Sequence, residues 1–175
     1  MRALTLFLIA LSLSSPLCGA AKTGSKSEPF TERTPAYFVD RYGSGDPSKT
    51  VPKYSFVDPK RGNVEINGQF SVRAFRSGDL RVKAVFNLSS LKLASVRLQL
   101  PRQWTPEQIQ SALMAYGSDW KPVGDNFMIQ KWATPTGLRA IYMLTFVEIQ
   151  SPEIAKSVEQ VLAAKDRERK AIPKF

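Results

Sequence analysis

The residue types that most often carry out catalysis are scarce in this chain. The sequence contains no histidine, and its single cysteine is Cys18. Histidine is the commonest general base and metal ligand, and a thiolate is another common nucleophile. A pair of carboxylates can hydrolyse a glycosidic bond, but the aspartates and glutamates are scattered without a spacing that identifies such a pair. The composition therefore predicts a protein that is not an enzyme and that holds no metal or cofactor.

Aromatic side chains are the second group that could make a site. Tryptophan is a large, rigid anchor that can contact a partner protein or a sugar. Trp120 and Trp132 are candidate binding residues on this ground, because both follow the expected second helix. Packing in the core behind that helix is the alternative for both tryptophans.

Basic residues form the third group. The formal net charge is +10, which favours contact with polyanions such as anionic lipid or acidic glycans. Several basic residues alternate with apolar ones in the expected strands, so they share one solvent-facing side of a sheet. An ordinary wet sheet face is the alternative, and nucleic acid is not expected because exposed aromatic residues should then interleave with the charges. The candidate residues of this face are Arg73, Arg81, Lys83, Lys92 and Arg97.

The first 21 residues have the order of an export signal. Arg2 is followed by the apolar run Ala3–Leu13, by Pro16, and by the small residues at Gly19–Ala21. The apolar run is too short to span a bilayer, which takes about 20 residues. We therefore expect cleavage after Ala20 or Ala21 and a periplasmic or extracellular protein with no membrane span. A buried N-terminal helix is the alternative.

Cys18 leaves with the signal peptide if cleavage occurs there. The mature chain then has no cysteine and forms no disulfide, and its net charge is one unit lower because Arg2 is also lost. A lipoprotein acylated at Cys18 is the alternative, but Pro16 and Leu17 are poor matches for the small residues that precede such a cysteine. Residues 22–33 are polar and read as a flexible linker.

Three helix starts share a Ser/Thr-Pro signal, in which the hydroxyl caps the helix and proline takes its first position. They are Thr34–Pro35, Thr105–Pro106 and Ser151–Pro152. Gly43 and Gly117 are the expected ends of the first two helices. The repeated order of helix and strands indicates two tandem halves, 34–100 and 104–164. A chance likeness of common cap and stop residues is the alternative.

The remaining segments alternate as antiparallel strands do. A strand is predicted at Val51–Val57, and Asn67–Gly68 predicts a hairpin turn between Val64–Ile66 and Phe70–Phe75. The alternation slips at Ala94–Ser95, which indicates a bulge. Further strands are expected over 80–86, 91–100, 127–133 and 138–149. The predicted fold is α+β, with an antiparallel sheet, two or three helices on one face, a single domain over 34–164, and a charged tail at 165–175.

The helix that ends in a Tyr-Gly stop, followed by a meander, resembles a known module of exported proteins. The matching residues are Thr34–Pro47 and Thr105–Trp120. The module is that of the β-lactamase-inhibitor protein and of the small lipoproteins of the outer-membrane β-barrel assembly machine. With Trp132 and Gly137, the second half is also similar to a group of short exported bacterial proteins. The inhibitor-type modules often carry disulfides, which this chain cannot form.

This resemblance implies a binding or structural module that contacts another envelope or secreted protein. A binder of polyanionic surfaces through the basic sheet face is the alternative function. A small hydrolase that uses carboxylates alone is a third and weaker hypothesis.

Overall fold

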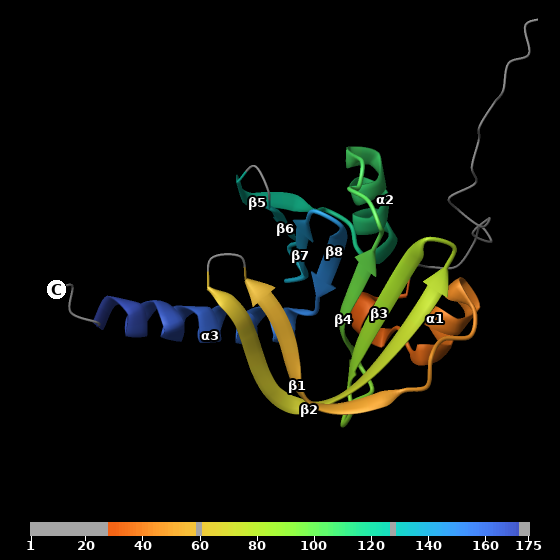
Figure 1. Cartoon of the computed structure of the whole chain (residues 1–175), viewed down its shortest axis with the longest axis horizontal. Helices are drawn as coiled ribbons and strands as arrows, with labels where there is room; N and C mark the ends of the chain where they lie inside the picture. Colours follow the sequence, from red (N-terminus) through yellow and green to blue (C-terminus); the bar gives the residue numbers. More distant parts are fainter. Residues whose placement is uncertain (1–27, 59–60, 127–128, 172–175) are drawn as a thin grey trace, which may run out of the picture.

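The computed structural model describes residues 28–58, 61–126 and 129–171. Within them, one antiparallel sheet of eight strands packs against three α-helices (Figure 1). The strand order across the sheet is β1-β2-β3-β4-β8-β7-β6-β5. This arrangement confirms the predicted α+β fold.

The chain forms two halves with the same order of elements, one α-helix followed by four strands. The first half comprises the 3₁₀ turn η1 (Phe30–Glu32), α1 (Pro35–Tyr42), β1 (Lys49–Asp58), β2 (Gly62–Ser77), β3 (Leu80–Asn87) and β4 (Leu93–Gln99). The second half comprises α2 (Pro106–Tyr116), β5 (Lys121–Asn126), β6 (Ile129–Ala133), β7 (Arg139–Met143) and β8 (Phe146–Gln150), and α3 (Pro152–Ala171) follows it. The halves join where β4 pairs with β8, which places Val96 opposite Ile149.

The helices begin and end where the sequence signals stand. Pro35, Pro106 and Pro152 each occupy the first position of a helix. Gly43 ends α1 with a backbone φ of +83°, a left-handed conformation that glycine adopts without strain. The three helix starts that the sequence predicts are therefore present.

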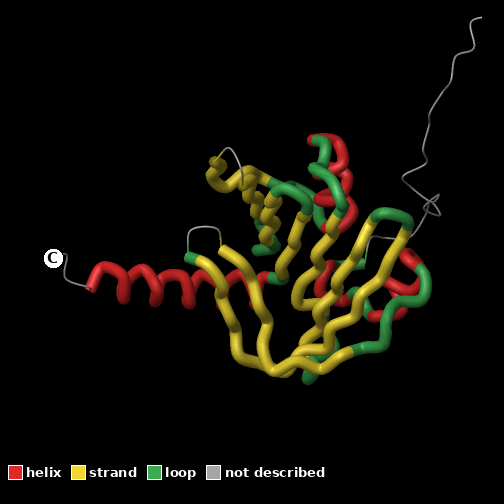
Figure 2. The backbone as a smooth tube through the Cα atoms, viewed as in Figure 1, coloured by secondary structure: helices red, strands yellow, loops and turns green. Residues whose placement is uncertain are grey.

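Two apolar layers cover the two faces of the sheet. On the first face, α1 and α2 contribute Phe38, Leu113 and Tyr116 to a core that includes Ala84 of β3. On the second face, α3 packs against a cluster that includes the adjacent β3 residue Val85. Two helices therefore share one face, as expected, whereas α3 covers the opposite face and runs outward to the left in Figure 2.

The Asn67–Gly68 signal does not form a turn. Both residues lie inside the continuous strand β2, so the predicted hairpin at this position is wrong. Val51 pairs with Phe70 and Lys53 pairs with Asn67, which leaves Gly68 and Gln69 opposite Pro52. Because proline has no backbone N–H, the ladder is interrupted there and a bulge forms instead.

The predicted strand at 138–149 is two strands. β7 ends at Met143, β8 begins at Phe146, and the turn between them contains Leu144 with a φ of +48°. A hairpin turn usually needs glycine or asparagine at such a φ, so the sequence carried no signal for it. The bulge expected at Ala94–Ser95 is present, because Leu93 and Ser95 pair with consecutive residues of β3 and leave Ala94 extra.

Strand β5 was not predicted, since Pro122 and Gly124 both disfavour strands. β6 covers the predicted strand from Ile129 onward, and residues 127–128 lie outside the described part of the chain. Residues 1–27, which hold the predicted signal peptide and Cys18, lie outside it as well, as do residues 172–175.

The fold extends beyond the predicted domain bounds at both ends. Phe30 and Arg33 are buried, so the last part of the predicted linker belongs to the domain. The charged segment from Lys165 continues α3 as far as Ala171. Arg61, beside the turn between β1 and β2, donates to Asp166 of this segment, which explains why the helix does not end at Lys165. No helix of the described residues is long and apolar enough to cross a membrane.

Candidate functional site

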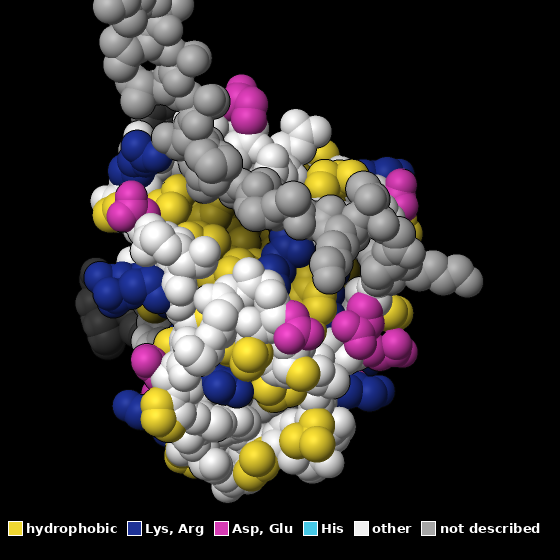
Figure 3. Space-filling model, turned by 90° about the vertical axis from the view of Figure 1, so that its right-hand side faces the viewer, with side chains coloured by type: hydrophobic (Ala, Val, Ile, Leu, Met, Phe, Trp, Pro, Cys, Tyr) yellow, Lys and Arg dark blue, Asp and Glu magenta, His cyan; other side chains and the backbone are white. Residues whose placement is uncertain are grey.

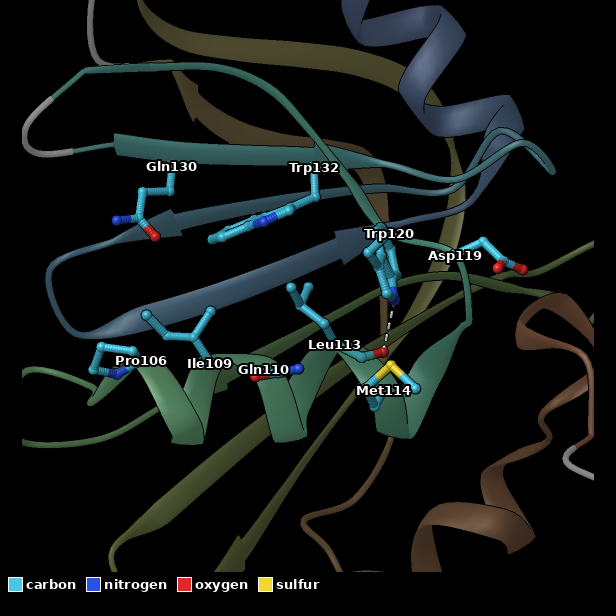
Figure 4. Close-up of a pocket in the computed structure, with 9 residues that line it drawn as sticks. All are labelled: Pro106, Ile109, Gln110, Leu113, Met114, Asp119, Trp120, Gln130 and Trp132. Carbon is cyan, nitrogen blue, oxygen red and sulfur yellow. Dashed lines mark hydrogen bonds between the residues drawn. The ribbon is translucent and has the colours of Figure 1, made fainter.

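Helix α2 forms one wall of the candidate site. Thr105 accepts a hydrogen bond from the backbone N–H of Gln108, and the Gln108 side chain accepts one from the backbone N–H of Thr105. This reciprocal cap fixes the first turn of the helix. Ile109 and Leu113, four residues apart, then lie on the same side and point toward the sheet (Figure 4).

Trp120 closes one end of this wall. Its indole N–H is shared between the carbonyl oxygens of Leu113, at 2.9 Å, and Gly117, at 3.1 Å. Both carbonyls lie at the C-terminal end of α2, and the Leu113 carbonyl also accepts a hydrogen bond from the backbone N–H of Gly117 at 3.1 Å. Trp120 therefore caps α2 through its polar atom while its ring lines the space beside the helix.

Trp132 comes from the opposite wall. It stands on β6, pairs with Ala140 of β7, and points across toward α2 (Figure 4). The ring is half-buried. Its indole N–H, unlike that of Trp120, has no hydrogen-bond partner among the described residues. Trp132 thus offers a free donor at the edge of an apolar surface.

Between these walls lies a cavity of about 440 Å³, within the size range of ligand pockets. Met114 stands at its rim with 60% of its surface exposed. The lining of the cavity is mostly apolar, with three polar side chains. The lining residues are Pro106, Ile109, Gln110, Leu113, Met114, Asp119, Trp120, Gln130 and Trp132. We call this cavity the α2 groove.

Both tryptophans singled out from the sequence therefore line the α2 groove. Core packing was the alternative for both residues, and it applies as well, because both rings pack against the apolar cluster of the first face. Gln110, Gln130 and Met114 were not singled out. Met114 could have been noticed, since it falls on the polar side of α2, outside the apolar spacing of Ile109 and Leu113.

The five basic candidates do not form a single face. Arg81, Lys83 and Arg97 lie on the second face of the sheet. Arg73 pairs with Ala84 on the first face, where its guanidinium lies 5.3 Å from the Phe75 ring centre. Lys92 lies before β4, outside the strand. The grouping was wrong for Arg73, because the register between β2 and β3 cannot be read from alternation within one strand. It was wrong for Lys92 because β4 begins only at Leu93.

A buried polar cluster on the second face was not singled out either. Glu148 is 2% exposed, and its carboxylate accepts hydrogen bonds from the Tyr54 hydroxyl and from the Arg97 Nε at 2.7 Å. Gln150 donates to the Tyr54 hydroxyl at 3.0 Å. Burial, with the nearby Glu148 charge, raises the pKa of Tyr54 well above its ordinary value. The only sequence signal was an acid between Val147 and Ile149, two apolar residues of one strand.

Arg33 occupies a second buried polar position. It is 4% exposed, and its guanidinium lies 4.8 Å from the ring centre of Tyr37 and 4.6 Å from that of Tyr116. Its Nη2 donates to the Ala115 carbonyl at 2.9 Å. Arg33 thus ties the N-terminal segment to the end of α2, by contacts that sequence spacing could not indicate.

No family model, curated protein or solved structure matches this sequence.

The chemistry open to the two sites differs. Both oxygens of the Glu148 carboxylate are engaged, and the cluster lies in the core, so it acts as a structural contact. The α2 groove combines apolar walls with a free indole donor and two side-chain amides. Such a surface can hold an apolar group and orient it with a few hydrogen bonds.

Proposed function

We propose that this protein is a non-catalytic, exported binding module that takes up an apolar segment of another envelope or secreted protein in its α2 groove. The observation that carries the proposal is the α2 groove itself, with the half-buried Trp132 on one wall and the exposed Met114 at its rim. Exposed aromatic and methionine side chains are enriched at protein interfaces. The export signal predicted at residues 1–21 supports a partner outside the cytoplasm.

The lining favours a protein segment over a sugar. Six of the lining side chains are apolar or aromatic, while Gln110, Asp119 and Gln130 are polar. A sugar brings many hydroxyl groups that must keep hydrogen bonds on burial, and three polar side chains offer few of them. A peptide needs partners only for the backbone amides next to an apolar anchor.

The free donor of Trp132 suits this role. A backbone carbonyl of a bound segment can accept from its indole N–H, and the Gln110 and Gln130 amides can each donate or accept. Trp120 cannot serve in this way because α2 already uses its N–H. We therefore assign Trp132 to binding and Trp120 to shaping the groove.

A binding role also agrees with the state of the buried acids. Glu148 is held by Arg97 and Tyr54, which leaves no oxygen for a substrate. Asp58, also 2% exposed, accepts from the backbone N–H of Arg61 at 2.9 Å. Asp119 is the one carboxylate among the residues that line the α2 groove, and a hydrolase that depends on carboxylates alone needs a pair.

The test is a selection of short random peptides displayed on phage against the purified chain. We expect the selected peptides to share one large apolar residue and to bind the chain in solution. Met114→Asp should then weaken their binding by at least tenfold, because it places a charge at the mouth of the α2 groove. Leu91→Asp is the matched control, since Leu91 is equally exposed, at 64%, and lies in the β3–β4 turn.

Equal binding by the wild type and the Met114→Asp variant would show that the peptides use another surface. Selection of peptides without any apolar anchor would contradict the proposal as well.

A further inference from the structure

We propose that one end of the second face of the sheet docks on a bilayer of anionic phospholipids, through Arg76, Arg81 and Lys83 and the turn residue Leu144 at the same end. This end lies away from the start of α3, where the backbone N–H of Ser151 donates to the Ala94 carbonyl. The bilayer contact is independent of the α2 groove, which lies on the first face.

Two of these cations stand directly opposite each other. Arg76 of β2 pairs with Arg81 of β3, and Lys83 follows two residues along β3 on the same side. Lys83 in turn pairs with Arg97 of β4. Like charges in directly opposite positions destabilise a sheet, so this arrangement costs stability unless an anion lies against it.

The protein itself supplies little compensation. Glu148 forms an ion pair with Arg97 and thereby balances that charge. Arg76, Arg81 and Lys83 form no ion pair with any described residue, and all three are exposed. Asp79, in the turn that joins β2 to β3, pairs with neither arginine. Three positive charges therefore face solvent together.

Such a cluster of positive charges is not found all over the surface. Figure 3 shows the side of the molecule on which α1 lies in Figure 1, and there the Lys and Arg side chains are interspersed with Asp and Glu. A surface of mixed sign attracts a polyanion weakly, whereas a single-sign cluster attracts it over about a Debye length.

Leu144 adds an apolar group at the same end of the sheet. Arg81 pairs with Gln99, Gln99 pairs with Phe146, and the turn that contains Leu144 immediately precedes Phe146. Leu144 is 51% exposed and adopts a φ of +48°, which is unfavourable for leucine. Both its exposure and its backbone conformation are costs that a polar residue or glycine would avoid.

Cations beside an exposed apolar side chain match an anionic bilayer better than other polyanions. Membrane-surface proteins combine attraction to lipid phosphates with insertion of apolar side chains. A single-stranded nucleic acid would need an exposed aromatic ring, but the Phe146 ring on this face is partly buried and lies 4.5 Å from the Arg97 guanidinium. An acidic glycan would gain nothing from Leu144.

The test is co-sedimentation of the full chain with vesicles, made either of phosphatidylcholine alone or of phosphatidylcholine mixed with phosphatidylglycerol. The variant carries Arg76→Glu, Arg81→Glu and Lys83→Glu. The matched control carries Lys49→Glu, Lys121→Glu and Lys156→Glu, three exposed lysines elsewhere on the molecule. Both variants change the net charge equally and keep the same N-terminal segment.

We expect the wild type to prefer the mixed vesicles and the first variant to lose on the order of a hundredfold in partitioning, because each basic residue near an anionic surface contributes about a factor of five. The control should lose far less, and Leu144→Asn should weaken binding at high salt as well as at low salt. Equal losses in the two charge variants would overturn the proposal. So would loss of heparin binding with unchanged vesicle binding, which would assign the face to an acidic glycan.

Discussion

Tyr54 of β1 donates its hydroxyl hydrogen bond to the Glu148 carboxylate of β8, although three strands separate β1 from β8 in the sheet. The contact is possible because the hairpin formed by β1 and β2 bends out of the plane of the other strands (Figure 1). The bend brings Tyr54 over the second face of the sheet, where Glu148 lies. The bulge opposite Pro52 lies within this hairpin. The Tyr54–Glu148 contact therefore holds the curled hairpin against the centre of the sheet.

Replacement of Tyr54 by phenylalanine should destabilise the fold. The change leaves one Glu148 oxygen buried without its donor, a loss of about 1–3 kcal/mol in the free energy of unfolding. Urea denaturation measures it. Tyr142→Phe is the control, because the Tyr142 hydroxyl is exposed and water can replace its bond to the Leu144 carbonyl. Equal losses in the two variants would mean that the buried contact contributes nothing special.

Alkaline pH should destabilise the protein. Burial raises the pKa of both Tyr54 and Tyr116 well above the ordinary value for a phenol. The folded state therefore keeps two protons that the unfolded state releases above about pH 10. The stabilisation is complete below that pH and is lost as the pH rises further, by about 1.4 kcal/mol per pH unit for each retained proton.

Denaturation curves recorded between neutral pH and strongly alkaline pH measure this slope. Tyr54→Phe removes one of the two retained protons, so it should reduce the slope of the free energy of unfolding against pH by about half. A free energy of unfolding that stays constant above pH 10 would show that both phenols ionise in the folded state.

The sequence predicted elements better than it predicted their pairing. Helix starts depend on local hydrogen bonds, so Thr105 and Pro106 could be identified without knowledge of the fold. The role of Asn67–Gly68 depends on what lies opposite it. Asn67 pairs with Lys53 of β1, Pro52 faces Gly68 and Gln69, and a bulge forms in place of the expected turn. Pairing of this kind is a long-range property that a local pattern does not contain.

The same distinction applies to the sites. Trp120 and Trp132 could be chosen by residue type alone, and the structure brings them to one groove. The basic cluster could not be grouped correctly, because Arg76 faces Arg81 only through the register of β2 and β3. In the sequence, Glu148 is one of several scattered acids. Its contact with Tyr54 depends on the bend of β1, which the sequence does not show.

Replacement of Leu144 by asparagine should stabilise the protein. Asparagine tolerates a left-handed backbone, whereas for leucine this conformation is unfavourable by about 1–2 kcal/mol. We expect a rise of about 1 kcal/mol in the free energy of unfolding and a higher Tm. The same substitution at Leu91, whose φ is +55°, is the matched comparison. A lower Tm for Leu144→Asn would show that the leucine side chain makes a stabilising contact within the fold.

The two groove tryptophans should differ in their effect on stability. Trp120→Phe removes a donor that the Leu113 and Gly117 carbonyls share, so it should cost about 1 kcal/mol more than Trp132→Phe. Thermal unfolding of the two variants checks this difference. Equal costs would contradict the separate roles assigned to the rings.

The most direct test of the α2 groove as a peptide site is the indole ¹H–¹⁵N NMR spectrum during titration with a peptide from the phage selection. The Trp132 signal should move strongly, because its free N–H gains an acceptor, while the Trp120 signal should move little, because its N–H is already bonded within α2. A Trp132 signal that stays in place while the peptide binds would contradict the account.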